Sequence, residues 1–390
     1  MKSTRQPPSS TMILVAFGGL GASLAAGYGV LFTIVDDYRS EYGISESSIG
    51  LVIGLGFIAG FISQILIAPY ADRGHSKSVV VFGVLVNVVG LLLMAKGTSL
   101  IPILIGRFVS GIGIGAAIPA VRRIVILADP DNLGQNIGRL VAADVFGFAI
   151  GPAISAVLVG PFGIPAPFIA VAVATLVLLP FVARVPVEEA PGPNGKRLAL
   201  DLLRIRPFAG AVTLGAAVFV MIGAFDALWA VVLDDLGTRD WVANIGITFF
   251  ALPLILLGPA GGRLAQTFGP FRLSAIGLLG GAMFMFTYGL LPTGGLIFAV
   301  AMVHALNDGL TVSSSSVAAG LVVPDSRQAG AQGVLGAASA LAAGVTAILV
   351  GFLYENYGRT TAYTACTLLM LVLVALGLWL ARSSWQLRRP

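Results

Sequence analysis

The chain has 390 residues, of which 57% are hydrophobic and only 11% are charged, and its mean hydropathy is +0.95. About a quarter of the residues of a soluble domain are charged, so this composition excludes a water-soluble enzyme. The formal net charge of +5 at pH 7 fits the cytoplasmic loops of a membrane protein, and no cluster of basic and aromatic residues indicates nucleic-acid binding. The single cysteine, Cys366, excludes a disulfide framework within the chain.

Apolar segments long enough to cross the hydrocarbon, which takes about 20 residues, follow one another along the chain. The first six are expected at roughly 12–35, 47–70, 79–97, 100–124, 136–160 and 164–183. The next six are expected at roughly 208–233, 242–265, 271–290, 294–322, 329–353 and 361–382. The first segment is about twice as long as the apolar core of a signal peptide, so it is predicted to be a permanent span.

A polar stretch separates the two sets of six spans, and its charged residues stand among prolines and glycines, as in a linker. The expected parts are an N-terminal tail (1–11), a first six-helix bundle (12–183), a linker (184–207), a second six-helix bundle (208–382) and a C-terminal tail (383–390).

The loop charges test this threading, because Lys and Arg accumulate in cytoplasmic loops. With both termini inside, 18 of the 23 basic residues fall in inner segments, four fall in outer segments, and Arg107 lies within a span. The sequence therefore predicts an integral multi-pass protein of a bacterial inner or plasma membrane, with both termini and the linker in the cytoplasm.

The two halves also echo each other at a fixed offset, which indicates an internal duplication. Gly50 and Gly246 open the second and eighth spans, 196 residues apart, and Gly163 and Gly358 precede the sixth and twelfth spans, 195 residues apart. These offsets are half of the chain length.

Residues 68–77, Ala-Pro-Tyr-Ala-Asp-Arg-Gly-His-Ser-Lys, carry Asp72, Arg73 and Lys77 between the second and third spans, and the echo of this segment in the second half carries Gln266 in place of Asp72. The first segment resembles motif A of the major facilitator superfamily. Residues 107–113, Arg-Phe-Val-Ser-Gly-Ile-Gly, are similar to motif B.

In the fifth span, Gly147, Gly151 and Pro152 resemble motif C, which in this superfamily is associated with drug/proton antiporters. The resemblance implies an all-α membrane protein with twelve transmembrane helices in two six-helix bundles, and it favours export over uptake. A Gly-x-x-x-Gly-Pro segment removes side-chain bulk and one backbone donor, which produces a close helix contact with a local bend. Such a seam is either a hinge or a static contact.

The motif A residues lie at a cytoplasmic helix end, where Asp72 and Arg73 are expected to pair with Arg122, Arg123 or Asp144 and to hold an outward-open state. Ordinary loop charge also explains Arg73 and Lys77, but explains Asp72 less well.

Ionisable residues inside spans are few, and each is costly unless it faces a cavity or a partner. They are Arg107, Asp144, Asp226, His304 and Asp308. His304 and Asp308 share a helix face at i, i+4 spacing, with Asn307 adjoining them. Asp226 and Asp308 are the leading candidates for proton carriers. The alternative is structural: Asp226 hydrated near the interface, and His304 and Asp308 satisfying one another.

Arg107 is expected to be functional, with Asp36 or Asp37 at the outer end of the first span as counter-ions. No nucleotide-binding Walker motif is present, and two histidines with one cysteine make a metal site improbable. We therefore expect no organic cofactor and no metal, with the proton as the coupling ion, and no enzymatic activity.

The sequence leads to the hypothesis of a monomeric secondary active transporter in the lipid bilayer, which exports a small cationic or amphipathic substrate by alternating access, with proton coupling. A proton symporter or facilitator that imports a small metabolite is the alternative. The expected substrate and coupling residues are Tyr28, Arg107, Asp226, Trp229, His304, Asn307 and Asp308.

Overall fold

The computed structural model describes residues 9–44, 46–187, 189 and 198–388, and within these ranges the chain forms helices and no strand. Twelve helical spans in the described residues are long and apolar enough to cross a membrane. The all-helical prediction of twelve spans is therefore confirmed.

Apart from the segment between Arg184 and Arg206, short connections join the helices. They are α1 (Ser10–Tyr42), α2 (Glu46–Leu66), α3 (Ser76–Lys96), α4 (Leu100–Ala128), α5 (Leu133–Phe162), α6 (Pro165–Arg184), α7 (Arg206–Asp235), α8 (Asp240–Phe268), α9 (Pro270–Leu290), α10 (Gly294–Thr311), α11 (Ser314–Val322), α12 (Gln328–Tyr357) and α13 (Arg359–Ala381). Short 3-10 helices lie at Ala68–Arg73, Pro130–Asn132, Ala199–Arg204, Asp325–Arg327 and Arg382–Ser384.

The tenth span is divided, whereas the apolar pattern predicts one helix over 294–322. The helix α10 ends at Thr311 and α11 begins at Ser314. The hydroxyl of Thr311 donates to the carbonyl oxygen of Asn307 at 2.8 Å, within its own helix. Back-bonding of this kind weakens and bends a helix, which gives a local reason for the break.

Contacts group the chain into two units. Unit 1 comprises the described residues of Met1–Pro130, Phe146–Arg197 and Asp325–Gly330, and unit 2 comprises Asp131–Val145, Leu198–Pro324 and Ala331–Pro390. The helices α5 and α12 each contribute to both: α5 begins in unit 2 and ends in unit 1, and α12 begins in unit 1 and continues in unit 2.

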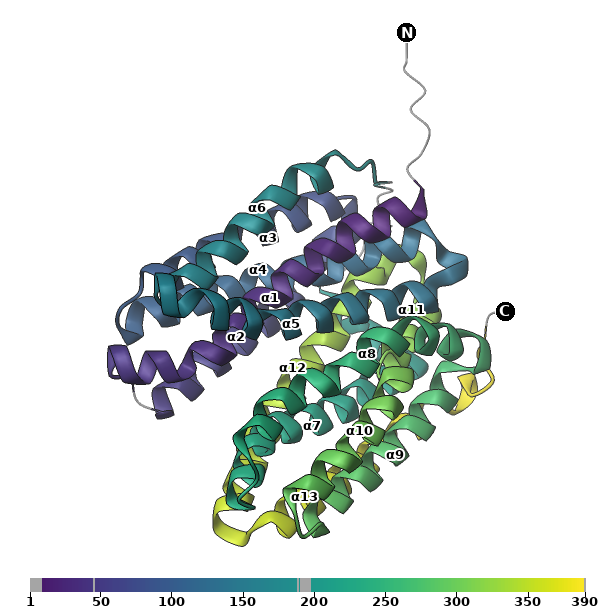
Figure 1. Cartoon of the computed structure of the whole chain (residues 1–390). Helices are drawn as coiled ribbons and strands as arrows, with labels where there is room; N and C mark the ends of the chain where they lie inside the picture. The colour runs from purple at the N-terminus through teal and green to yellow at the C-terminus, as the bar shows by residue number, and fades with distance from the viewer. Residues whose placement is uncertain (1–8, 45, 188, 190–197, 389–390) are drawn as a thin grey trace. The chain divides into compact units, whose positions relative to one another are not determined.

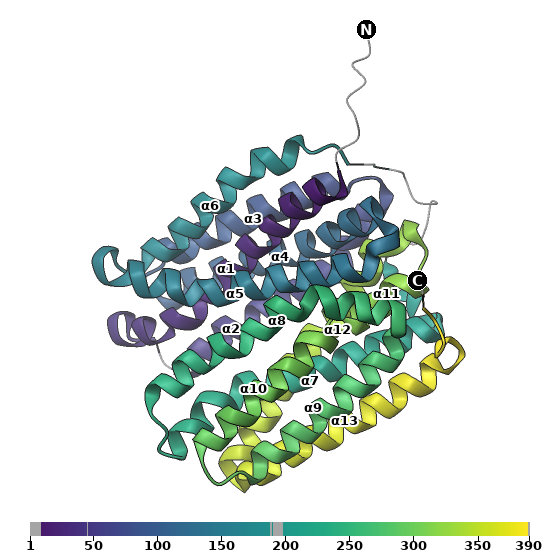
Figure 2. The same ribbon diagram turned by 45° about the vertical axis from the view of Figure 1, so that its right-hand side comes forward.

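Within unit 1, α3 packs between α4 and α6, and α1 contacts both α4 and α6 (Figure 1). A buried apolar cluster, including Leu31, Leu91, Ile103 and Phe168, fills the space among these four helices. Within unit 2, α13 packs against α7 and α9, and α10 packs against α8 and α9 (Figure 2).

Small residues allow α3 and α4 to lie unusually close together. A Cβ atom added to Gly90 of α3 would clash with the backbone nitrogen of Ser110, and one added to Gly106 of α4 would lie 2.8 Å from the carbonyl oxygen of Gly90. Close backbone approach through Gly is a common basis of helix association in membranes, where the hydrophobic effect between helices is absent.

We expect Gly90→Ala to destabilise the protein by roughly 1–3 kcal/mol, because backbone rather than a flexible side chain must move to make room. Thermal unfolding of the detergent-purified protein measures the effect. Gly19→Ala is the matched control, since a Cβ atom there meets nothing within 4 Å. Equal unfolding midpoints for the two variants would contradict the close packing of α3 and α4.

Candidate functional site

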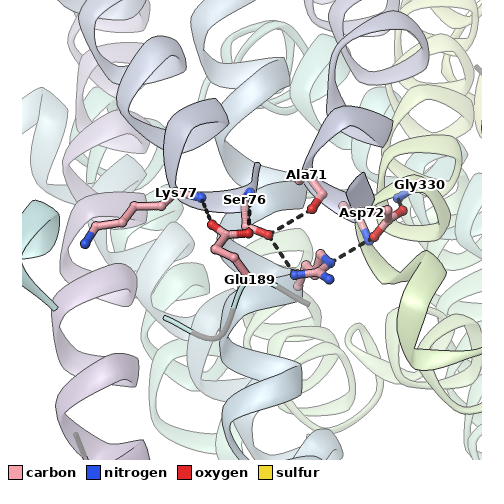
Figure 3. A network of polar contacts seen from close by, with 8 residues as sticks. Ala71, Asp72, Ser76, Lys77, Glu189 and Gly330 are labelled. Carbon is pink, nitrogen blue, oxygen red and sulfur yellow. Dashed lines mark hydrogen bonds and ion pairs between the residues drawn. The ribbon is translucent and has the colours of Figure 1, made fainter. Parts of the chain in front are cut away.

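Asp72 lies at the centre of a buried polar network in unit 1. Its carboxylate is only 5% exposed and accepts hydrogen bonds from Arg123 Nε at 3.0 Å, from the amide of Ala329 at 2.9 Å and from the amide of Gly330 at 2.7 Å (Figure 3). The two amides belong to the first turn of α12, where backbone donors lack helical partners and the helix dipole favours an anion. Asp72 therefore links three elements: its own 3-10 helix Ala68–Arg73, the helix α4 through Arg123, and the beginning of α12.

The network continues from Arg123 to the beginning of α3. Arg123 Nη1 donates to the hydroxyl of Ser76 at 2.7 Å, and that hydroxyl donates to the carbonyl oxygen of Ala71 at 2.9 Å. The carboxylate of Glu189 then accepts from the amides of Ser76 at 3.0 Å and Lys77 at 2.7 Å. We call Asp72, Ser76, Arg123, Glu189 and the first turn of α12 the Asp72 network.

The structure selects among the partners that the sequence left open for Asp72. The guanidinium that reaches Asp72 is that of Arg123, while Arg122 is half-buried on the same helix and Asp144 belongs to unit 2. The other basic residues of the motif contact groups other than Asp72. Arg73 lies over the ring of Tyr70 at 4.8 Å, and Lys77 Nζ donates to the carbonyl oxygen of Val185 at 2.9 Å.

Glu189 is a functional candidate that the sequence analysis counted only as linker charge. A carboxylate just before a helix is a familiar N-terminal cap, but Glu189 is 113 residues from Ser76 in the sequence. No local signal could have paired it with α3.

The second half contains a neutral counterpart of the Asp72 contact. In unit 2, the side-chain oxygen of Gln266 accepts from the amide of Gly134 at 2.6 Å, and its side-chain nitrogen donates to the carbonyl oxygen of Asp131 at 2.5 Å. Gln266 thus binds the beginning of α5 as Asp72 binds the beginning of α12. Both duplicated segments therefore accept a hydrogen bond from the beginning of a helix, the first through the carboxylate of Asp72 and the second through the neutral amide of Gln266.

The motif C residues form a tight seam between α5 and α1. A Cβ atom on Gly147 would clash with the carbonyl oxygen of Ala22, and one on Gly151 would lie 2.5 Å from the backbone nitrogen of Val30. Pro152 follows within the same helix α5. Backbone therefore touches backbone along this seam.

A second buried polar cluster surrounds His304 in unit 2. Its Nε2 lies 3.5 Å from the Asp308 carboxylate and 3.2 Å from the sulfur of Met221, and its Nδ1 lies 2.9 Å from the hydroxyl of Tyr288. Asn307 donates to Asp308 at 3.1 Å. His304 is 1% and Asp308 4% exposed. We call these five residues the His304 cluster.

The His304 cluster is enclosed by aromatic rings. The ring of Phe284 stacks on the imidazole of His304 at 4.8 Å, and Phe250 meets it edge-on at 5.6 Å. Within the part of the chain that the structure describes, His304 is the only ionic partner of Asp308. Asp308 therefore lies beside a side chain that can itself carry a proton.

Two predicted site residues, Asp226 and Trp229, follow Met221 on α7 and differ in exposure. Trp229 is buried and stacks on Phe225 at 4.8 Å, while the side chain of Asp226 is exposed. Phe225 in turn contacts Phe250, one of the rings against His304. Asp226 is thus the next residue after Phe225, whose ring contacts His304 through the ring of Phe250.

Arg107 lies in unit 1 beneath the ring of Tyr28. The guanidinium carbon is 4.5 Å from the ring centroid, and the residue is 3% exposed. Of the two predicted counter-ions, Asp37 is half-buried on α1, and the side chain of Asp36 lies outside the described residues.

A cavity of about 560 Å³ opens near the C-terminal end of α7 in unit 2. Its polar lining comprises Asp235, Tyr354, Glu355 and Arg359, and the hydroxyl of Tyr354 donates to Asp235.

Twelve apolar spans, a duplicated helix-end contact and buried ionisable clusters define a membrane transporter of the two-bundle type. The sequence profile of the Major Facilitator Superfamily matches residues 15–239 and 214–388. The chain belongs to the Major Facilitator Superfamily, as its motifs indicate.

Similarity to curated proteins is partial. The uncharacterized MFS-type transporter MJ1560 of Methanocaldococcus jannaschii is 29% identical over 143 residues, which are 36% of this chain and 37% of that protein. Quinolone resistance protein NorA of Staphylococcus aureus is 25% identical over 133 residues, or 33% of each chain. The MFS-type transporter SLC18B1 of Rattus norvegicus is 24% identical over 185 residues, 46% of this chain and 41% of that protein. The matches span about two fifths or less of these relatives.

Solved structures share the fold over nearly the whole chain. The human organic anion transporter MFSD10 superposes with a TM-score of 0.75 at 18% identity, covering 95% of this chain and 100% of that one. The proton:xylose symporter XylE gives a TM-score of 0.76 at 16% identity, covering 96% and 98%. These likenesses establish the major facilitator fold.

We expect Asp72→Asn to destabilise the protein by about 3–5 kcal/mol, because it leaves the buried charge of Arg123 without its partner. Arg123→Gln should have a similar effect, and the double variant should cost less than the sum of the two. Chemical unfolding of the purified protein measures this cycle. Additive effects would show that the two side chains do not interact.

Glu189→Gln should cost about 1 kcal/mol, because an amide presents one acceptor oxygen where two backbone amides need two. The specific readout is faster hydrogen exchange at Ser76 and Lys77. Glu188→Gln removes the same charge from the neighbouring position and serves as the control. Unchanged exchange at the beginning of α3 would rule out the cap.

Proposed function

We propose that this chain is a proton-coupled exporter of small amphipathic compounds that works by alternating access. The observation that carries the proposal is the ion pair of His304 and Asp308, buried on α10 at 3.5 Å. Buried ionisable groups in membrane spans are costly to keep and commonly mark proton or substrate pathways.

The pair suits a proton relay because both side chains can carry a proton and they lie 3.5 Å apart. When the pair holds one titratable proton, it is either an imidazolium beside a carboxylate or a neutral imidazole beside a carboxylic acid. Binding a further proton gives the cluster a net positive charge, and Met221 and Tyr288 offer no compensating carboxylate. A proton taken up here therefore changes the electrostatics of the site.

Asp226 is the proposed partner of this cluster in coupling. Its exposed carboxylate lies on α7, five residues beyond Met221, which contacts His304. We propose that Asp226 exchanges protons with water and that the His304 cluster holds the proton during the conformational change.

The Asp72 network is the proposed latch of one state in the cycle. Its carboxylate binds the first turn of α12 through the amides of Ala329 and Gly330. Opening would break the two hydrogen bonds from the amides of Ala329 and Gly330 to one buried anion.

Two comparisons support export. The segment with Gly147, Gly151 and Pro152 resembles the motif of drug/proton antiporters, and a third of the chain is similar to a protein named for quinolone resistance. Import by proton symport or facilitated diffusion is the competing outcome of the test.

The test uses the purified protein in liposomes that enclose a pH-sensitive dye. A panel of amphipathic compounds is added under an imposed proton gradient, and both proton flux and compound flux are recorded. We expect Asp308→Asn and Asp226→Asn to abolish compound-dependent proton flux, since an amide cannot release a proton at these sites. Glu41→Gln, which alters an exposed carboxylate of α1, should leave it intact.

Opposed movement of compound and protons in the parent supports antiport, and parallel movement would indicate symport instead. Compound movement without proton flux, unaffected by either substitution, would contradict the coupling mechanism and leave a facilitator.

A further inference from the structure

The guanidinium of Arg107 is a buried cation without a carboxylate among the described residues that contact it. Its Nε atom is fully buried and has no hydrogen-bond partner in the part of the chain that the structure describes. The group lies against Tyr28 of α1 on one side. On another it lies over Gly56 of α2, where a Cβ atom would clash with the guanidinium carbon.

The ring of Tyr28 does not compensate for burying this charge. A cation over an aromatic ring gains about 0.5–2 kcal/mol, whereas removing an ion from water costs several kcal/mol. Asp72, the buried carboxylate of the same unit, is already bound to Arg123. Asp36 follows Tyr28 by eight residues, which places its backbone roughly 12 Å further along the helix axis.

The surroundings of the guanidinium are aromatic. The ring of Tyr28 meets Phe57 at 5.6 Å and Phe148 at 5.7 Å between centroids. All three aromatic residues are half-buried, so the rings reach the accessible surface while the cation lies beneath one of them. We call Arg107 and these three rings the Arg107 site.

We propose that the Arg107 site binds the carboxylate group of a monoanionic amphipathic substrate, whose apolar part packs against the rings of Tyr28, Phe57 and Phe148. This inference rests on the proposed export function, because it names the chemical class of the exported compound. The planar fork of a guanidinium matches the two oxygens of a carboxylate.

The charge of the site favours a monoanion over a phosphate ester or another dianion. One guanidinium neutralises one negative charge, and a second charge would remain uncompensated at low dielectric. The three rings offer no further hydrogen-bond donors except the hydroxyl of Tyr28. Highly hydroxylated compounds are therefore poor candidates for this site.

The experiment measures binding without a proton gradient, on the full-length protein in lipid nanodiscs, by equilibrium dialysis. The probes are 2-naphthoate and its uncharged amide, 2-naphthamide, which have the same ring system. We expect the parent to bind 2-naphthoate at least about tenfold more tightly, as a charge-assisted hydrogen bond predicts. Arg107→Gln should remove this preference and leave 2-naphthamide binding unchanged.

Two further variants keep the test decisive if Arg107→Gln does not fold. Arg107→Lys keeps the charge but loses the fork, so it should retain only part of the preference. Tyr28→Leu removes a ring and should weaken the binding of both probes.

The proposal is overturned if the parent binds the two probes equally or binds neither, or if Arg107→Gln keeps the preference. It is also overturned if the preference appears only after Asp36→Asn, since Asp36 would then occupy the guanidinium. Transport is measured in a separate experiment, the liposome assay of compound-dependent proton flux. A preserved binding preference without compound-dependent proton flux would contradict the exporter mechanism and not the assignment of the Arg107 site.

Discussion

The three hydrogen bonds that the Asp72 carboxylate accepts are the interaction on which the organisation of unit 1 depends. An ionised carboxylate that is 5% exposed is tolerable only when its lone pairs are matched by donors. Arg123 supplies one donor with a full charge, and the first turn of α12 supplies two with partial charge. The same guanidinium bonds to Ser76, whose amide binds Glu189, so the linker, α3, α4 and α12 are connected through one buried anion.

The duplicated halves treat the equivalent position differently, and the difference has a physical consequence. Gln266 makes two hydrogen bonds at the beginning of α5, but it is neutral, and the nearby packing relies on glycines. Gly134 and Gly262, for example, would clash with each other's backbone if either carried a Cβ atom. A charged contact responds to protonation and to nearby charge, whereas a glycine seam does not.

Much of the fold could be predicted from hydropathy, because a segment of about 20 apolar residues is long enough to cross the membrane and twelve such segments follow one another in this sequence. The break between Thr311 and Ser314 could not, because hydropathy averaged over the whole span 294–322 hides the short polar run Ser313–Ser316 at the break. For the sites, i, i+4 spacing already placed His304 beside Asp308. The partners from other helices could not be predicted from local spacing, because Met221 is 83 residues from His304 and Gly330 is 258 residues from Asp72.

Arg107 shows why such partners cannot be deduced. The sequence suggests a carboxylate counter-ion from the first span, which contains two candidates at its outer end. Among the described side chains, the ring of Tyr28, 79 residues away, lies over the guanidinium, while the side chain of Asp36 lies outside them. Space for the cation comes from Gly56 on a third helix. The pairing of a charge inside a bundle depends on which helices are neighbours, and hydropathy does not encode that.

We propose that the Asp72 network holds one conformational state and breaks during transport. The most direct measurement is the distance between spin labels at Ser78, beside the network on α3, and at Asp325, before α12, in a Cys366→Ser background. The account predicts two distances in lipid nanodiscs, with Asp72→Asn shifting the population towards the longer one. A single distance that is the same in the parent and in Asp72→Asn would contradict it.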